Sequence, residues 1–279
     1  MARIKIITDS ASDLPVDEAT RLNVDVIPLS IRFGDEEFVD RRDITPTAFW
    51  ERCASSDALP ETAAPSPGAF QDAFTQAQAD GFDGVVVIAI SSKLSATYQS
   101  ALAAKEAMGD YPVEVIDSQA VTMAEGLLVI TVAEAASKGA SFDECVTLTK
   151  SLIPRLGVVG ALDTLEHLKR GGRIGSAAAL LGSMLSIKPL LTLRDGEVVE
   201  DGRQRTRAKA LDHLARDAAE ASPFERLAVV HGAADDAVRL ITMLAHIECD
   251  TPLVVTDIGP VVGTHAGPGI IGVCWIEKV

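Results

Sequence analysis

Apolar and polar positions in the first half of the chain alternate between strand-length and helix-length patterns. Residues 3–8 predict a buried strand, and residues 84–90 form a continuous apolar run, as expected when helices cover both faces of a sheet. Residues 69–79 have a helical pattern, and Ser141 and Glu144 have the spacing of a capping box at the start of a later helix. Strands and helices in this order predict a mostly parallel sheet.

The sequence between these elements predicts shorter strands, a short helix and a loop. Residues 24–33 are rich in β-formers, and the glycine-containing turn after them predicts a hairpin. Thr45 and Pro46 predict an N-cap followed by proline in the first turn of a short helix. Residues 55–68 are polar and contain three prolines, which predicts a loop.

The pattern changes in the second half of the chain. Asp195-Gly196 separates two short apolar runs, residues 189–193 and 197–200, and this dipeptide is a strong hairpin signal. The second half is therefore predicted to contain a mixed or antiparallel sheet. We expect an α/β protein of two domains, residues 1–154 and 155–279, with a ligand between them.

Small polar side chains follow the predicted strands. Ser10 lies just after the first strand, Ser92 and Ser95 lie after the apolar run of residues 84–90, and Thr62 lies in the proline-rich loop. In open α/β sheets, ligands sit at the carboxyl ends of the strands, often against helix N-termini. These hydroxyls could therefore hold one carboxylate or phosphate, although Ser95 and Thr62 could equally serve only as helix caps.

Residues 259–269 combine four glycines, two prolines and one histidine. They predict a loop whose backbone can approach a ligand closely, with His265 able to donate to an anion. The other histidines have no such context and are interpreted as structural. Lys169–Arg173 could supply a cation to the same anion, or form a solvated basic helix end. Residues 177–193, helical over 177–185, could line an acyl tunnel or simply pack in the core.

Composition narrows the classes of partner. Hydrophobic residues make up 47% of the chain but aromatic residues only 4%, so any pocket is lined mainly by aliphatic side chains, which suit an alkyl chain better than a flat ring. A net charge of −15 argues against nucleic acid as a partner. The N-terminus enters a strand without an apolar leader, no run reaches the roughly 18 residues of a membrane span, and the four cysteines form no CxxC pair. We therefore expect a cytoplasmic protein with no transmembrane segment.

Signatures of several enzyme classes are missing from the sequence. It contains no G-x-S-x-G elbow, no Walker A motif and no GxGxxG after the first strand, and we find no His/Asp/Glu cluster with metal-ligand spacing. We expect no metal and no cofactor. A triad of Ser95, His265 and Asp9 can be drawn, but nothing in the sequence orients it. A hydrolase or transferase that acts on an acyl or phosphorylated small molecule with a Ser95–His265 pair is the alternative to a binding protein.

Six short motifs together resemble the DegV family of fatty-acid-binding proteins in order and spacing, across essentially the whole chain. The motifs are T-D-S-A-S-D-L (8–14), I-P-L-S-I (27–31), T-A-A-P-S-P-G (62–68), S-S-K-L-S-A-T-Y-Q-S-A (91–101), G-G-R-I (171–174) and G-P-V-V-G-T-H-A-G-P-G (259–269). The chain departs from the usual family pattern at Ala63, Ala64 and Ala96, where Ser, Gln and Gly are common. These changes leave the neighbouring hydroxyls in place.

The resemblance implies a two-domain α/β fold that binds a long-chain fatty acid between its domains. It implies that Thr62 and Ser95 hold the carboxylate, and that Arg173 and His265 complete the polar network. It also implies that a separate ATP-dependent kinase phosphorylates the bound fatty acid to an acyl phosphate. The chain would then be a bacterial binding subunit and not itself an enzyme.

A cationic cluster follows the predicted hairpin, although the chain as a whole is acidic. Arg203, Arg205, Arg207 and Lys209 fall within seven residues. They belong either to an ordinary solvated face or to a surface that attracts an acidic partner. Because the resemblance places a kinase beside the bound carboxylate, we expect Arg203, Arg205 and Arg207 to contribute to kinase docking.

Overall fold

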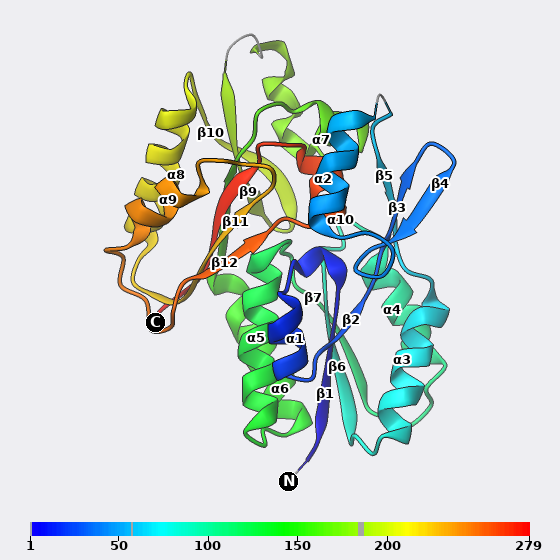
Figure 1. Cartoon of the computed structure of the whole chain (residues 1–279). Helices are drawn as coiled ribbons and strands as arrows, with labels where there is room; N and C mark the ends of the chain where they lie inside the picture. Colours follow the sequence, from blue (N-terminus) through cyan, green and yellow to red (C-terminus); the bar gives the residue numbers. More distant parts are fainter. Residues whose placement is uncertain (1, 57, 184–186) are drawn as a thin grey trace.

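The structure is a computed structural model that describes residues 2–56, 58–183 and 187–279 (Figure 1). The described residues form three β-sheets: a four-stranded sheet, a six-stranded sheet and a small three-stranded sheet. The four-stranded and six-stranded sheets lie in different halves of the molecule, with helix α5 between them (Figure 1). This arrangement confirms the predicted α/β class.

The four-stranded sheet is entirely parallel, as the strand and helix order predicted. Its strands run in the order β2-β1-β6-β7, with bounds Asp25–Ile27, Ile4–Asp9, Gly84–Ala89 and Val113–Asp117. Helices α3 (Pro67–Ala79) and α4 (Thr97–Glu106) cover one face through residues such as Phe70 and Phe74. Helices α5 (Met123–Ser137) and α6 (Phe142–Leu152) cover the other face. Both faces of β1 and β6 are therefore buried.

The small antiparallel sheet confirms the hairpin predicted after residues 24–33 and corrects the loop predicted over residues 55–68. Its order is β4-β3-β5, with bounds Glu36–Val39, Ser30–Phe33 and Glu61–Ala63. The β-rich run of residues 24–33 is divided between this sheet and the parallel sheet, because the chain leaves β2 before Pro28. The segment predicted as a loop over residues 55–68 holds β5, and a three-residue strand is too short to show an alternating pattern.

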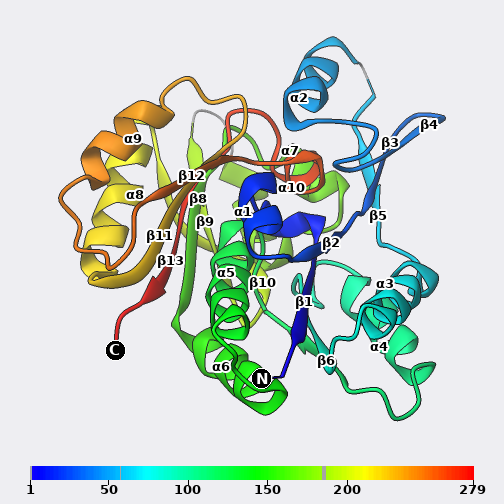
Figure 2. The ribbon, with the colours of Figure 1, turned by 60° about the horizontal axis from the view of Figure 1, so that its bottom comes forward.

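The six-stranded sheet is mixed, and all its neighbouring pairs are antiparallel except β11 with β12. Its order is β10-β9-β8-β13-β11-β12, with bounds Glu197–Gln204, Lys188–Arg194, Leu156–Ala161, Ile271–Glu277, Phe224–His231 and Val254–Asp257. The predicted hairpin is confirmed: Arg194 pairs with Glu197 across Asp195-Gly196, and both turn residues have positive φ, as a type I′ turn requires. Helices α8 (Arg207–Ala221) and α9 (Ala237–Leu244) cover the outer face (Figure 2).

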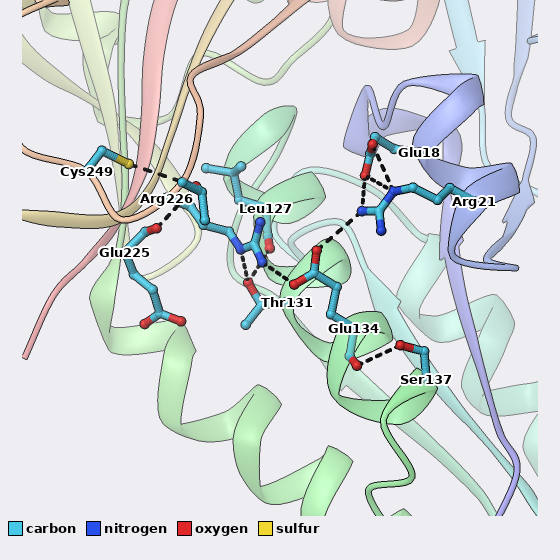
Figure 3. Close-up of polar contacts among 10 residues, drawn as sticks. Glu18, Arg21, Leu127, Thr131, Glu134, Ser137, Glu225, Arg226 and Cys249 are labelled. Carbon is cyan, nitrogen blue, oxygen red and sulfur yellow. Dashed lines mark hydrogen bonds and ion pairs between the residues drawn. The ribbon is translucent and has the colours of Figure 1, made fainter.

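Helix α5 joins the two large sheets into one core. Residues 123–130 of this helix are all buried, which is typical of a helix enclosed in a core, and they pack beside residues of both sheets, such as Val86 and Cys274. A polar contact adds to this packing: Arg226 of β11 donates to Thr131 Oγ1 at 2.8 Å and to Glu134 Oε2 at 2.6 Å, while Arg21 contacts Glu134 from the other side (Figure 3). The chain passes to the second sheet at Ile153–Arg155. The domain boundary near Pro154 stays a prediction.

Short helices complete the fold, and one of them overturns a loop prediction. The remaining elements are η1 (Ser10–Ser12), α1 (Val16–Arg21), α2 (Pro46–Ser55), α7 (Glu166–Arg170), the 3₁₀ helix η3 (Gly175–Ser183) and α10 (Pro260–Ala266). Residues 259–269 were predicted as a loop, yet α10 occupies most of them. Gly263 lets α10 pack closely against Phe49, because a Cβ at this position would lie only 2.7 Å from the Phe49 ring. This packing outweighs the weak helix propensity of glycine.

Two further predictions concern helices. Thr45 caps α2 with Pro46 in its first turn, and Ser141 and Glu144 form the predicted capping box of α6. The helix predicted over residues 177–185 is a 3₁₀ helix as far as Ser183, and its last positions lie outside the described residues. Among the described residues, no helix has the length and apolar character needed to cross a membrane.

Candidate functional site

An apolar cavity lies between the parallel sheet and the six-stranded sheet. The cavity volume is about 140 Å³. Most of its lining side chains are aliphatic, as the aromatic-poor composition led us to expect. They are Leu29, Ile90, Leu94, Val121, Val158, Leu162, Leu168, Leu191, Leu193, Val198, Val230, Ile258, Val261, Val262 and Ile270.

Two glycines form part of the cavity floor. Gly160 of β8 pairs with Gly272 of β13, so neither strand places a side chain at this point of the sheet. A Cβ at Gly160 would lie 3.4 Å from Ile270 Cδ1, which is ordinary van der Waals contact. The space at the floor therefore depends on the missing side chains. Neither glycine was predicted to belong to the site, although glycine inside a predicted strand is a signal that another chain or a ligand approaches closely.

Polar groups gather at one end of the cavity. Thr62 from β5, Ser95 from the loop before α4, Arg173 from the turn after α7 and His265 from the last turn of α10 all line it. Thr62 Oγ1 lies 2.8 Å from His265 Nε2. The structure thus brings together four predicted site residues that are spread over more than 200 positions of the chain.

Arg173 is held in place by backbone carbonyls from both halves of the chain. Its Nε donates to Leu94 O at 3.0 Å, and its Nη1 donates to Gly171 O at 2.5 Å. Within the described part of the chain its Nη2 has no hydrogen-bond partner. The side chain is half-buried. The edge of the guanidinium that carries Nε and Nη1 is therefore fixed, while Nη2 can still donate to an anion at this end of the cavity.

His265 is neutral at physiological pH. Its burial, and then the charges of Arg173 and His167, lower its pKa to about 4. With the ring proton on Nε2, the imidazole donates to Thr62 Oγ1, and the hydroxyl proton of Thr62 is left to donate to an anion in the cavity. Arg173 then supplies the positive charge at this end, and His265 orients a hydroxyl.

The cavity meets the surface at this polar end. Thr62, Arg173 and His265 line both the apolar cavity and a polar hollow outside it. Other walls of the hollow come from Glu61, His167, Arg170 and Thr264. An anionic head group bound to the three shared residues would thus lie at the mouth of the cavity, with its apolar part inside.

Two predicted ligand-binding hydroxyls lie elsewhere. Ser92 donates to Asp117 Oδ2 at 2.5 Å, and Ser10 accepts from the backbone N–H of Leu29 at 3.1 Å; neither lines the cavity. Each hydroxyl fixes a strand end to its neighbour. Ser95 does line the cavity, and its Oγ also accepts from the backbone N–H of Thr97 at 3.3 Å, so it orders the start of α4 as well.

The imagined triad is not assembled. His265 Nε2 contacts Thr62 and not Ser95, whose Oγ lies 2.8 Å from Thr97 Oγ1. Asp9 is buried, and its two oxygens accept from the backbone N–H groups of Ala11 and Ile90. Ser95, His265 and Asp9, the three members of the imagined triad, therefore each hydrogen-bond to a different partner.

The cationic cluster is partly used inside the fold. Arg207 pairs with Asp236 at 2.8 Å and donates to Gly269 O at 2.6 Å. Arg203 pairs with Glu200 at 3.1 Å, whereas Arg205 is exposed. Of the three arginines expected to dock a partner, Arg207 thus has a structural role that the sequence did not show.

One group of possible metal ligands was overlooked. His213 Nε2 lies 2.8 Å from Asp201 Oδ2 and 3.0 Å from Asp217 Oδ2, an arrangement that could hold a metal ion. The three residues have no metal-ligand spacing in the sequence, because Asp201 lies on β10 while the other two residues are four apart on α8. Arg216 Nη2 lies 2.7 Å from His213 Nδ1 and 3.3 Å from Asp217 Oδ1, so a guanidinium already offsets this acidic charge.

Comparison with known proteins gives the family of the chain. A family model described as "Uncharacterised protein, DegV family" matches residues 3–278. The chain belongs to the DegV family. A DegV domain-containing protein of Clostridium perfringens is 34% identical to it over 282 residues, 99% of each chain.

Solved structures share the whole fold. A structure described as "Fatty Acid Binding of a DegV family Protein from Thermus thermophilus" has a TM-score of 0.90 and 34% identity, with 99% of this chain and 100% of that chain covered. A stearic acid-binding protein from Eubacterium ventriosum has a TM-score of 0.89 and 28% identity, with coverage of 100% and 99%. The family resemblance inferred from the motifs is confirmed over the full length of the chain.

Proposed function

We propose that this DegV protein binds one long-chain fatty acid, with its tail in the aliphatic cavity and its carboxylate at Thr62, Ser95 and Arg173. The observation that carries this proposal is the cavity itself, which is apolar along its length and ends at one guanidinium and two hydroxyls. Family members described as binding fatty acid or stearic acid support the choice of ligand. Each buried methylene contributes about 0.8 kcal/mol, so a long chain favours tight binding.

A binding role fits the polar end better than catalysis does. A general base needs a second group that orients it, as an Asp orients His in a Ser-His-Asp triad. His265 Nδ1 is buried without a hydrogen-bond partner in the described structure, and Ser95 is not its neighbour. Turnover of acyl esters by the purified protein alone would favour the hydrolase or transferase alternative.

The place of the carboxylate supports presentation to a second protein. The polar hollow outside the cavity contains Arg170 and His167 beside the three shared residues, so a phosphoryl donor could approach the carboxylate from this side. We infer that an ATP-dependent kinase reaches the fatty acid here and forms an acyl phosphate. The family resemblance of the motifs is the further support for this step.

Delipidated protein is expected to gain thermal stability when a long-chain fatty acid is added, because a ligand that binds only the folded state stabilises it. The methyl ester of the same acid should give a smaller shift, since it fills the cavity but carries no charge for Arg173. Differential scanning fluorimetry with stearic acid and methyl stearate measures both. The proposal fails if neither ligand raises the melting temperature.

Arg205→Glu is expected to leave fatty-acid affinity unchanged and to slow acyl phosphate formation by the cognate kinase. Arg205 is exposed, and the defect should fade with added salt because exposed charges are screened over about 10 Å at 0.1 M ionic strength. Kinase turnover is measured against salt for wild type, Arg205→Glu and the control Lys138→Glu, an equal charge change at the exposed end of α5. Equal turnover of all three at low salt would assign Arg205 to an ordinary solvated face.

A further inference from the structure

Two arginines on either side of a glycine pair line the polar hollow outside the cavity. Arg173 lines both the cavity and this hollow, whereas Arg170 lines the hollow and not the cavity. Arg170 ends α7, and Gly171 and Gly172 form the turn that leads to Arg173. The two arginines therefore mark an inner and an outer position on the path out of the cavity.

The glycine pair brings the turn between the arginines against the site. Gly172 has a φ of +69°, in the left-handed region that favours glycine. A Cβ at Gly171 would lie 2.2 Å from His265 Nδ1, so a larger residue there would strike the site histidine. The close approach of this turn places Arg170 and Arg173 around the same hollow.

The outer arginine can be recruited by an anion. Arg170 Nη2 lies 3.2 Å from Glu166 Oε1, but both side chains are more than half exposed, and such pairs contribute little to stability. His167 lines the same hollow, and its Nδ1 lies 3.2 Å from Thr264 O. Because a carbonyl only accepts, this contact puts a proton on Nδ1. In the part of the chain that the structure describes, Nε2 of His167 has no partner and stays available to a ligand.

The charges around the hollow favour an anion. Glu61 is the one carboxylate among the described residues that line it, and Arg32 of β3 pairs with Glu61 at 2.5 Å. Arg170 and Arg173 thus leave an excess of positive charge in a chain whose net charge is −15. A cationic hollow directly outside a carboxylate seat suits an anion that extends beyond the carboxylate.

Phosphorylation of the fatty acid would move its negative charge from the inner to the outer position. In the proposed kinase step, one carboxylate oxygen forms a bond to the γ-phosphorus of ATP, and ADP leaves with the oxygen that bridged them. The carboxyl group becomes a neutral carbonyl, and the new phosphoryl group carries a charge of about −2. This group starts at the mouth of the cavity, where Thr62, Arg173 and His265 line both spaces.

We propose that Arg170, assisted by His167, binds the phosphoryl group of the acyl phosphate in the polar hollow, so that the protein holds the product as well as the fatty acid. This inference rests on the proposed function. Arginine suits this role because its guanidinium can form two parallel hydrogen bonds to a phosphate. The carboxylate of the unmodified fatty acid ends at Arg173, so Arg170 distinguishes the acyl phosphate from the fatty acid.

The test compares two ligands with the same acyl chain. They are stearic acid and the ketophosphonate analogue of stearoyl phosphate, in which a methylene group replaces the bridging oxygen and prevents hydrolysis. Calorimetry measures the affinity of both for delipidated wild type, Arg170→Ala and the control Lys169→Ala. Lys169 is the neighbouring exposed cation on α7 and does not line the hollow, so the control makes the same change of charge beside the site.

Arg170→Ala is expected to bind the ketophosphonate about tenfold more weakly than wild type and to bind stearic acid equally well. Tenfold is the lower end of what hydrogen bonds to a charged group contribute, as suits an exposed arginine. Lys169→Ala should bind both ligands as wild type does. Thermal melts establish that the variants fold, which the exposure of both side chains favours.

The outcomes separate this inference from the proposed function. The inference is overturned if Arg170→Ala binds the ketophosphonate as wild type does, if Lys169→Ala loses as much, or if wild type binds stearic acid but not the ketophosphonate. An equal loss for both ligands in Arg170→Ala would also overturn it, because Arg170 would then serve the carboxylate. If wild type binds neither ligand, the proposed function itself fails.

Discussion

Arg173→Ala is expected to weaken the binding of a long-chain fatty acid by about 1.5–3 kcal/mol, the usual contribution of hydrogen bonds to a charged group. Two carbonyls, Leu94 O and Gly171 O, already fix the guanidinium, so little conformational entropy is lost when it meets the carboxylate. His265 does not replace the lost charge, because burial, the largest cause of its lowered pKa, persists in the variant.

Calorimetry or fluorescence titration of stearic acid and methyl stearate against wild type and Arg173→Ala measures this interaction. The variant should lose affinity for the acid and hardly change its affinity for the ester, which isolates the charge interaction from changes in the cavity. Arg170→Ala removes a cation from the outer hollow and serves as the control. Equal losses for acid and ester would mean that Arg173 supports only the shape of the site.

The parallel half of the fold follows directly from local patterns. Residues 84–90 form an apolar run because both faces of β6 are covered, and the capping box at Ser141 and the turn at Asp195-Gly196 are signals read from a few neighbouring residues. Such features depend on local geometry, so sequence alone predicts them. Local patterns also pointed to Ser95, a hydroxyl after a strand, and to the cationic segment Lys169–Arg173, and the family motifs then singled out Ser95 and Arg173.

Features that depend on contacts between distant segments were missed. Strand β5 owes its structure to pairing with β3, and α10 forms because Gly263 allows Phe49 to pack against it. The contact between Thr62 and His265 joins those two elements, so no local signal could reveal it. Ser10 and Ser92 were predicted for the site because their loops are polar, but their hydroxyls hydrogen-bond within the first half of the chain.

The second large effect concerns the dependence of stability on pH. Asp13 is buried where three segments meet: its Oδ1 accepts from the backbone N–H of Gly259 at 2.9 Å, and its Oδ2 lies 2.6 Å from Thr122 Oγ1. Desolvation raises its pKa from 3.8 to about 7, although the bonds from Thr122 and Gly259 act in the opposite direction. The folded protein therefore holds a proton at Asp13 that the unfolded chain releases at a lower pH.

The sign of the effect follows from this difference. A carboxyl whose pKa is higher in the folded state contributes its full stability below the unfolded pKa of 3.8, and this contribution is lost as pH rises toward 7. The free energy of unfolding should thus fall by about 2 kcal/mol between about pH 5.5 and pH 8 through Asp13 alone. Asp9, whose burial raises its pKa to about 6, adds a loss of the same sign.

Asp13→Asn is expected to remove the Asp13 part of this loss. The amide keeps an acceptor for Gly259 and offers a donor to Thr122, so it imitates the protonated acid at every pH. The variant should match wild type near pH 5.5 and exceed its free energy of unfolding by about 2 kcal/mol near pH 8. Urea unfolding at both pH values measures the difference, and Asp110→Asn, on an exposed turn, is the control. If wild type and Asp13→Asn lose stability equally between the two pH values, Asp13 is ionised in the folded protein throughout, and its bonds to Gly259 and Thr122 outweigh its burial.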